Sequence, residues 1–230
     1  MTDREAAALA AQAITLVKPG EVVGLGTGQA AAAFIRALGA AVRSGLSVTA
    51  VATSEASATL AGSLGITLVG EPSAIDIAVD GADEVDPRLD LIKGFGGALV
   101  REKVVAAAAR RFIVLCGKDK LVPVLGARGR LPVEVVPFAM PFCGRRLSEM
   151  GMPPSLRYRE GTPFITDNGN LILDAAVTPI ADPAALDATL RGIPGVVGTG
   201  LFVAMVTLVL VWDEGSVRTL RPEPREEERP

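Results

Sequence analysis

The sequence predicts an α/β fold: a large domain built on a doubly wound, mostly parallel sheet, with a smaller α+β domain attached. Alanine-rich, helix-like segments alternate with short apolar runs through the first half of the chain, which is typical of strands connected by helices. From about residue 131 the pattern changes. Five prolines fall within residues 132–154, and an Asp-Asn-Gly-Asn turn follows at 167–170, which indicates a separate unit containing a hairpin.

The first half of the chain supplies the parallel sheet. Short apolar, strand-like runs bounded by turns indicate buried strands, and a helix-like stretch follows most of them, so helices are expected on both faces of the sheet. The expected helices are 4–17, 30–38, 54–64 and 98–111, and the expected strands are 21–25, 48–52, 66–69, 75–79 and 112–116.

The second half supplies the smaller domain. Residues 164–173 are expected to form a hairpin, 183–190 a helix, and the apolar run 201–212 one long buried strand reached through residues 195–199. These patterns predict a large catalytic domain at 1–128 plus 204–220 and a small domain at 129–203. The tail at 221–230 has no apolar anchor and is expected to be disordered.

Composition narrows the class of function. The 230 residues are 49% hydrophobic and 21% charged, with a formal net charge of −3 and no histidine. Such a chain can fold around a sizeable core, and it lacks the basic field that attracts nucleic acid or anionic membranes. Without histidine, proton transfer falls to carboxylates and lysines. We therefore expect an enzyme acting on a small molecule, with no nucleic-acid partner.

Two further features bear on location. The run 201–212 is about eight residues short of the roughly twenty that a membrane-spanning helix needs, so no membrane partner is expected. Cys116 and Cys143 have no paired spacing, and no secretory signal opens the sequence. Packed thiols in a cytoplasmic protein are the expectation.

The strongest cluster of chemical groups lies between residues 80 and 102. The acidic run DGADEVD at 80–86 directly follows an apolar strand that ends at Val79. Lys93, a glycine-rich turn and Glu102 come next along the chain. Carboxylates at the end of a buried strand are costly unless they contact a ligand or donors. An acidic turn that merely ends the strand is the plain alternative. A calcium loop is a weaker reading, because the EF-hand spacing is absent.

Glu102 is expected in the second turn of a helix. Its neighbours one turn away are Ala98, Val105 and Ala106, so its carboxyl would be partly desolvated and its pKa raised towards that of a general base. A surface glutamate paired with Arg101 or Lys103 is the alternative interpretation.

A second candidate is the Gly26-Thr27-Gly28 turn between a strand and a helix. Glycines there admit a close anion or sugar hydroxyl, and the helix start presents free amides. The segment matches neither the dinucleotide-binding nor the phosphate-binding-loop spacing, and an ordinary strand-to-helix turn would look similar.

Together these segments resemble the type A ribose-5-phosphate isomerase family. The resemblance spans roughly residues 5 to 215, and its motifs are GLGTG at 24–28, ATSE at 52–55, DGADEVD at 80–86, KGFGGALVREK at 93–103, LPVEVVPFA at 131–139, TDNGNLILD at 166–174 and IPGVVGTGLF at 193–202. It implies interconversion of ribose 5-phosphate and ribulose 5-phosphate without metal or cofactor, in a homodimer or homotetramer.

The resemblance also implies residue roles. Glu102 would move the proton between two sugar carbons, while Asp80, Asp83 and Lys93 would handle the hydroxyl protons and ring opening. The substrate-binding residues it implies are Gly26, Thr27, Gly28, Gln29, Gly94, Gly96, Gly97 and Lys120. A transition state of this kind needs donors for the developing enediolate oxygen, and Lys93 with the amides of residues 94–97 is expected to supply them.

The sequence departs from the family pattern at Ala6, Gln29-Ala30 and Phe95, and Lys118 could offer a relocated cation. The first two departures touch the expected phosphate site, and Phe95 replaces a glycine of the turn. An isomerase of another sugar or sugar phosphate therefore remains an alternative. A sugar-phosphate-binding module and an acyl-CoA transferase are two others.

Overall fold

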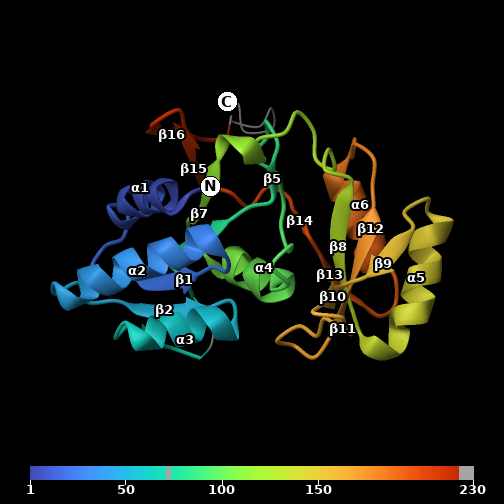
Figure 1. Ribbon diagram of the computed structural model, residues 1–230, viewed down its shortest axis with the longest axis horizontal. Helices are drawn as coiled ribbons and strands as arrows, with labels where there is room; N and C mark the ends of the chain where they lie inside the picture. Colours follow the sequence, from blue (N-terminus) through green and yellow to red (C-terminus); the bar gives the residue numbers. More distant parts are fainter. Residues whose placement is uncertain (71–73, 223–230) are drawn as a thin grey trace.

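The computed structural model describes residues 1–70 and 74–222, and it confirms the α/β fold class. Its main sheet has seven strands in the order β16-β15-β7-β4-β1-β2-β3, parallel throughout except for β16 at the edge (Figure 1). The strands are β1 (Val22–Leu25), β2 (Thr49–Ala52), β3 (Thr67–Leu68), β4 (Ile77–Gly81), β7 (Phe112–Gly117), β15 (Leu208–Asp213) and β16 (Ser216–Leu220).

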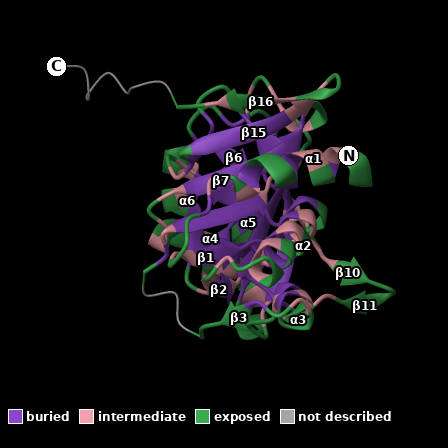
Figure 2. Ribbon diagram, turned by 90° about the vertical axis from the view of Figure 1, so that its left-hand side faces the viewer, coloured by how far each residue is buried: buried purple, intermediate pink, exposed green. Residues whose placement is uncertain are grey.

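Helices cover both faces of this sheet. Apolar side chains of α1 (Asp3–Ile14), α2 (Gln29–Arg43) and α3 (Glu55–Ser63) form one core with one face of the strands. On the other face, α4 (Leu99–Ala108) contributes Val105 and Ala106 to a second core. The central strands are buried nearly throughout (Figure 2), so their carboxyl ends form a fixed platform.

The predicted helices of the first half are confirmed to within a few residues, apart from α2, which runs five residues further than expected, to Arg43. Local caps set two of the starts. Thr2 and Glu5 form a capping box on α1, and Ser54 accepts a hydrogen bond from the Ser57 amide at the start of α3.

A four-stranded antiparallel sheet with order β13-β8-β12-β9 dominates residues 130–199, which we call the antiparallel part. The third core cluster lies here and includes Cys143 and Leu147 of α5 and Leu190 of α6. Its elements are β8 (Arg130–Val135), the short 3₁₀ helix η2 (Pro137–Ala139), α5 (Met140–Glu149), β9 (Pro154–Leu156), β10 (Tyr158–Arg159), β11 (Thr162–Pro163), β12 (Leu171–Ala176), α6 (Pro183–Arg191) and β13 (Val196–Thr199). A second 3₁₀ helix, η1 (Lys118–Lys120), directly follows β7 of the main sheet.

The expected hairpin closes through an antiparallel bridge between Ile165 and Leu171, and the helix expected at 183–190 is α6. The division into domains at 1–128 plus 204–220 and 129–203 stays a prediction. Of the tail expected to be disordered, residues 223–230 lie outside the described residues.

The prediction of one long strand at 201–212 is wrong. Leu201–Phe202 form β14, which pairs with β6 (Leu91–Ile92) in a small sheet with β5 (Glu84–Val85). Only from Leu208 does the chain join β7 in the main sheet as β15. Ala204 between them has a φ of 57°, which breaks the extended conformation. Both halves are apolar, so hydropathy does not reveal the break.

One glycine joins the antiparallel part to this small sheet. The carbonyl of Gly200 accepts a hydrogen bond from the Lys93 amide at 2.9 Å, and the Gly200 amide donates to the Pro132 carbonyl at 2.8 Å. A Cβ atom at position 200 would collide with the carbonyl of Lys93. The backbone at Lys93 is therefore fixed by direct contact with Gly200.

Candidate active site

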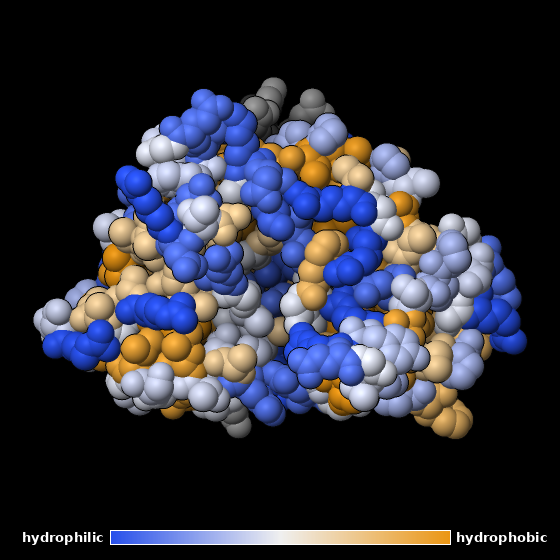
Figure 3. Space-filling view, in the orientation of Figure 1, coloured by the Kyte–Doolittle hydropathy of each residue, from blue (hydrophilic) through white to orange (hydrophobic). Residues whose placement is uncertain are grey.

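A cavity of about 230 Å³ lies at the carboxyl ends of the central strands. In the space-filling view, hydrophilic side chains gather around a hollow in the middle of the face (Figure 3). The cavity is lined by Met1, Thr27, Gly28, Gln29, Ala30, Gly81, Ala82, Asp83, Lys93, Gly94, Gly96, Glu102, Leu115, Cys116, Gly117, Asp119 and Lys120. Ligands of parallel α/β sheets bind at this edge.

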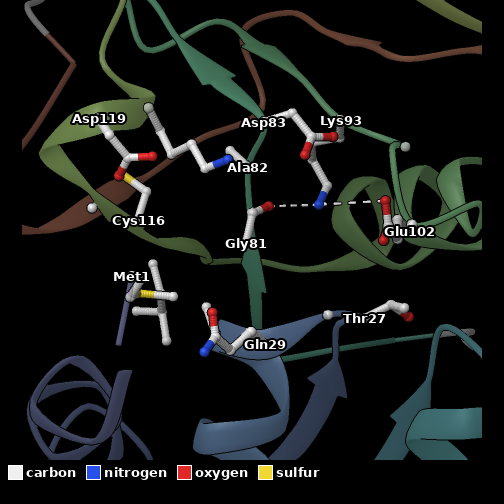
Figure 4. A pocket seen from close by; sticks show the side chains of 17 residues that line it. Met1, Thr27, Gln29, Gly81, Ala82, Asp83, Lys93, Glu102, Cys116 and Asp119 are labelled. Atoms are coloured by element: carbon white, nitrogen blue, oxygen red, sulfur yellow. Dashed lines mark hydrogen bonds and ion pairs between the residues drawn. The ribbon is translucent and has the colours of Figure 1, made fainter. Parts of the chain in front are cut away.

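Lys93 is the centre of the charged groups. Its ammonium lies 3.0 Å from an Asp80 carboxylate oxygen and 3.4 Å from Oε2 of Glu102, and it donates to the Gly81 carbonyl at 2.6 Å. Figure 4 shows it reaching from one wall of the cavity towards Glu102. Burial opposes its charge, but the two carboxylates outweigh burial and raise the pKa of Lys93 above its ordinary value. Lys93 therefore stays positively charged at neutral pH.

Asp80 lies behind Lys93, near the end of β4. Its Oδ1 accepts hydrogen bonds from the amides of Thr27 at 3.0 Å and Gly81 at 2.7 Å, while Oδ2 faces Lys93. Gly26 allows this packing, because a Cβ there would fall on the Asp80 carboxyl. Both oxygens of Asp80 are thus occupied by protein donors.

Glu102 has a different environment. Its side chain is only 4% exposed, and its Oε2 has no hydrogen-bond partner in the described part of the protein besides the ion-pair contact with Lys93. Burial raises the pKa of Glu102 to about 8, against the lowering effect of the Lys93 charge. Burial also raises the pKa of Asp80. Asp80 accepts from three donors whereas the Oε2 of Glu102 contacts Lys93 alone, so hydrogen bonding stabilises the Asp80 carboxylate more.

The turn at residues 93–97, which we call the Lys93 turn, forms the adjoining wall. Gly94 and Gly97 adopt φ values of 102° and 99°, whereas Phe95 keeps a negative φ. The phenylalanine therefore does not strain the turn, and its ring is not among the residues that line the cavity. The Phe95 amide donates to Oδ2 of Asp83 at 2.9 Å. A phenylalanine at position 95 is thus compatible with this turn.

The opposite end of the cavity is formed by the start of α2 and by η1. Gly28, Gln29 and Ala30 present the first amides of α2, and Lys120 approaches from η1. Free amides at a helix start together with an ammonium favour an anion. The Thr27 hydroxyl meets a group of hydroxyls belonging to Thr53, Ser54 and Ser57, with the first two contacts at 2.8 Å.

Most of the predicted site residues come together here. Asp83, Lys93, Glu102, Thr27, Gly28, Gln29, Gly94, Gly96 and Lys120 all line the cavity. Gly26, Gly97 and Asp80 do not: Gly26 makes room for Asp80, and the Gly97 amide donates to the Gly94 carbonyl.

Three other residues singled out in the sequence lie elsewhere. Asp86 accepts hydrogen bonds from the amides of Arg88 and Asp90 in its own loop. Lys118 pairs with Asp213 and Glu214 and is not a relocated cation in the cavity. Ala6 is buried in α1.

Sequence reasoning missed Met1, Asp119 and the end of β7 as cavity residues. The end of β7 could have been predicted as part of the cavity, because β7 lies beside β4 and neighbouring parallel strands end at the same edge of a sheet. The contact of Met1 arises only from the tertiary packing of α1.

Within residues 1–70 and 74–222, no three His, Cys, Asp or Glu side chains are grouped so that they could hold a metal ion. Among the helices of the same residues, none has both the length and the apolar character that crossing a membrane requires.

Comparisons with known proteins point to one family. A family model described as ribose 5-phosphate isomerase A (phosphoriboisomerase A) matches residues 49–215. The ribose-5-phosphate isomerase A of Thermomicrobium roseum is 51% identical over 223 residues, covering 95% of this chain and 94% of the relative. That of Gloeobacter violaceus is 49% identical over 216 residues, covering 93% and 94%.

Solved structures give the same result. Ribose 5-phosphate isomerase A from Methanocaldococcus jannaschii superposes with a TM-score of 0.92 at 42% identity, covering 96% of this chain and 100% of that chain. A D-ribose-5-phosphate isomerase in complex with phospho-erythronic acid also has a TM-score of 0.92, at 38% identity, with 96% and 100% covered.

Proposed function

Because the chain belongs to the ribose 5-phosphate isomerase A family and interconverts ribose 5-phosphate and ribulose 5-phosphate, we propose that Glu102 is the base that moves the proton between C2 and C1 of the sugar. One observation supports this role most directly. Glu102 is a buried carboxyl at the wall of the cavity, and within the described residues its Oε2 has no hydrogen-bond partner and lies 3.4 Å from a charged lysine. A desolvated carboxyl of this kind is basic enough to remove a proton from carbon.

In the proposed reaction, the ionised Glu102 carboxylate takes the proton from C2 of the open-chain aldose. The electrons of the C2–H bond form a double bond between C1 and C2, and O1 becomes negatively charged. The protonated Glu102 then returns the same proton to C1, while the proton of the C2 hydroxyl moves to O1. One carboxyl close to both carbons is sufficient for both transfers.

The negative charge on O1 needs preorganised donors. We assign this role to the Lys93 ammonium and to the amides of Gly94 and Gly96, which line the same cavity as Glu102. Asp83, also at the cavity wall, is assigned the transfer of the hydroxyl proton between O2 and O1 and assistance in ring opening. Asp80, with both oxygens already occupied, instead serves as the fixed counter-charge that holds Lys93.

For the phosphate we propose the end of the cavity formed by the start of α2 and by Lys120. Gln29 lies at this end, and its side-chain amide nitrogen donates a hydrogen bond to the Asp3 carboxylate at 3.2 Å. Gly28 and Ala30 contribute backbone there, so the amides at the start of the helix can bind the phosphate.

The direct test is to incubate the purified protein with ribose 5-phosphate and to follow formation of the ketose. Ribose and other pentose phosphates serve as comparisons. We expect ribose 5-phosphate to be the best substrate, and unphosphorylated ribose to be turned over much more slowly, because the phosphate site contributes binding energy. Absence of any ketose with ribose 5-phosphate would reject the function.

We also propose that the protein is a homodimer or homotetramer. Phe138 is 97% exposed, and Val136 and Val197 are 40% exposed nearby in the antiparallel part. A fully exposed phenylalanine beside other exposed apolar residues favours a protein interface.

A further inference from the structure

The side of the Lys93 turn that faces away from the cavity is held by an arginine from the antiparallel part. Arg157, between β9 and β10, donates to the carbonyl oxygens of Gly94 at 2.7 Å and Phe95 at 3.2 Å. Its remaining nitrogens bind both carboxylate oxygens of Asp174 on β12, with the Nε–Oδ2 distance at 2.9 Å. The side chains of Arg157 and Asp174 are each only 9% exposed.

The Phe95 side chain forms a second attachment at the same place. Its ring packs against the apolar core of the antiparallel part. The Arg130 guanidinium lies over the ring at 3.9 Å from its centroid, and its Nε is 3.5 Å from Oδ1 of Asp174. Asp174 therefore connects the two arginines that hold the turn.

Because each peptide is planar, a contact that fixes a carbonyl of the turn also fixes the direction of the amide that follows it. In a trans peptide the C=O and the following N–H lie in one plane and point in opposite directions. By fixing the Phe95 carbonyl, Arg157 directs the Gly96 amide to the opposite side, and Gly96 lines the cavity. By fixing the Gly94 carbonyl, it directs the Phe95 amide that binds Asp83.

The turn needs such support, because Gly94 and Gly97 leave its backbone with more freedom than other residues would. In the described part of the chain, the amides of Gly94 and Gly96 have no protein acceptor. The peptide that carries the Gly96 amide is held from its carbonyl side, where Arg157 binds the Phe95 carbonyl. The Gly94 carbonyl is held both by Arg157 and by the Gly97 amide.

We propose that Arg157, held by Asp174, is a positioning residue for the isomerisation: it aims the Gly96 amide and the Asp83 carboxylate into the cavity, and Phe95 with Arg130 anchors the same turn. This inference rests on the proposed function. It adds that donors to the enediolate are set by contacts from outside the cavity, through residues that do not touch the substrate.

The test compares Arg157→Lys with the wild-type protein in steady-state isomerisation of ribose 5-phosphate. Lysine keeps the charge but cannot bind Asp174 and two carbonyls together. We expect kcat to fall between about 10- and 100-fold while KM changes less than about threefold, since misaimed donors weaken the transition state more than the ground state. Millimolar guanidinium chloride should restore part of the kcat of Arg157→Ala.

Arg145→Lys is the matched control, since Arg145 is an exposed arginine on α5 of the same part, and its kcat should stay within about twofold of the wild-type value. A folded Arg157→Lys with wild-type kcat, or with a raised KM alone, would overturn the proposal. An inactive wild-type protein would instead reject the proposed function, so the two failures are distinguishable.

If Arg157→Lys does not fold, the variant Phe95→Leu tests whether contacts from outside the cavity position the Lys93 turn. It removes the ring under Arg130 but keeps an apolar side chain, and Phe142→Leu removes a comparable ring beside Arg145 as its control. A lower kcat with an unchanged Tm in Phe95→Leu supports the proposal. An unchanged kcat there contradicts it.

Discussion

At Glu102, two opposing effects set the protonation of one carboxyl. Burial disfavours its charge and is the larger effect, whereas the Lys93 ammonium 3.4 Å away favours it. Asp80 accepts hydrogen bonds from two backbone amides that Glu102 lacks. These different surroundings support the proposed division of roles, with Asp80 as the counter-charge of Lys93 and Glu102 as the proton acceptor.

Replacing Glu102 by glutamine should remove the base while keeping the shape of the cavity. We expect kcat for ribose 5-phosphate to fall by about 10³-fold, the range that general bases contribute, while the variant still binds ribose 5-phosphate. Kinetic assays and calorimetry measure the two quantities. Glu55→Gln, at the exposed start of α3, should behave as wild type. A Glu102→Gln variant with near-normal turnover would remove Glu102 from the role of base.

The pH profile follows from the same group. Glu102 acts in its ionised form, and burial raises its pKa to about 8 in the free protein. We therefore expect kcat/KM to rise with pH, by about tenfold per unit well below this pKa, and to level off above it. Lys93 stays charged over this range, so we expect no decrease of kcat/KM at higher pH from its deprotonation. A profile that is flat or falls between pH 6 and 9 would contradict this assignment.

At the scale of elements, the cavity depends on where helices and 3₁₀ turns begin after parallel strands. The start of α2 and η1 come from different strand ends, β1 and β7, yet they share one end of the cavity. Neither element alone forms an anion site. Their combination follows from the parallel order of the sheet.

Lys120 and Lys118 on η1 make a matched pair for testing this end of the cavity. Lys120→Ala should raise KM for ribose 5-phosphate roughly 10- to 100-fold, the effect of one charge-assisted hydrogen bond to phosphate. Lys118→Ala should leave KM unchanged, because Lys118 pairs with Asp213 and Glu214 outside the cavity. Equal effects of the two variants in the same kinetic assay would argue against a specific phosphate contact.

The loop at 166–170 connects the antiparallel part to the helices of the main sheet. Oε1 of the buried Glu134 on β8 accepts hydrogen bonds from Thr166, Asn168 and Asn170 at 2.9–3.1 Å. The same loop then reaches outward. Its Asp167 accepts from the amide of Glu55 at 2.8 Å, so Glu134 indirectly supports a contact with α3.

Glu134→Gln should lower the free energy of unfolding by about 1–3 kcal/mol, because a neutral amide oxygen is a weaker acceptor than the carboxylate oxygen that three donors share. Urea denaturation monitored by circular dichroism measures this change. Glu149→Gln, at the exposed end of α5, should change stability by less than about 0.5 kcal/mol. Similar denaturation midpoints for the two variants would show that the loop is held by other contacts.

At the scale of the whole molecule, the exposed apolar surface around Phe138 predicts self-association. Light scattering after size-exclusion chromatography should give a mass of two or four chains, and Phe138→Asp should shift it towards smaller species, since a buried charge is costly at an interface. The Tm of the isolated chain should change little. A wild-type protein of one-chain mass would exclude the proposed assembly.

Much of this molecule could be predicted from its sequence. Periodicity indicated the parallel sheet, and the parallel order explains why Asp80, Asp83 and Glu102 converge although they lie on different elements. What local patterns could not predict are contacts set by tertiary packing. The break at Ala204 lies inside a uniformly apolar run, and Arg157 reaches the Lys93 turn from more than sixty residues away.

The peptide at Gly200 has a consequence for how such a cavity can change over time. Its carbonyl and amide link the Lys93 backbone to Pro132, and it has no side chain to contribute. A substitution at position 200 would change none of the residues that carry reactive groups, yet it would displace the backbone of Lys93 and with it the ammonium. Comparing reactive groups alone would class such a variant as intact, although its chemistry would already be impaired.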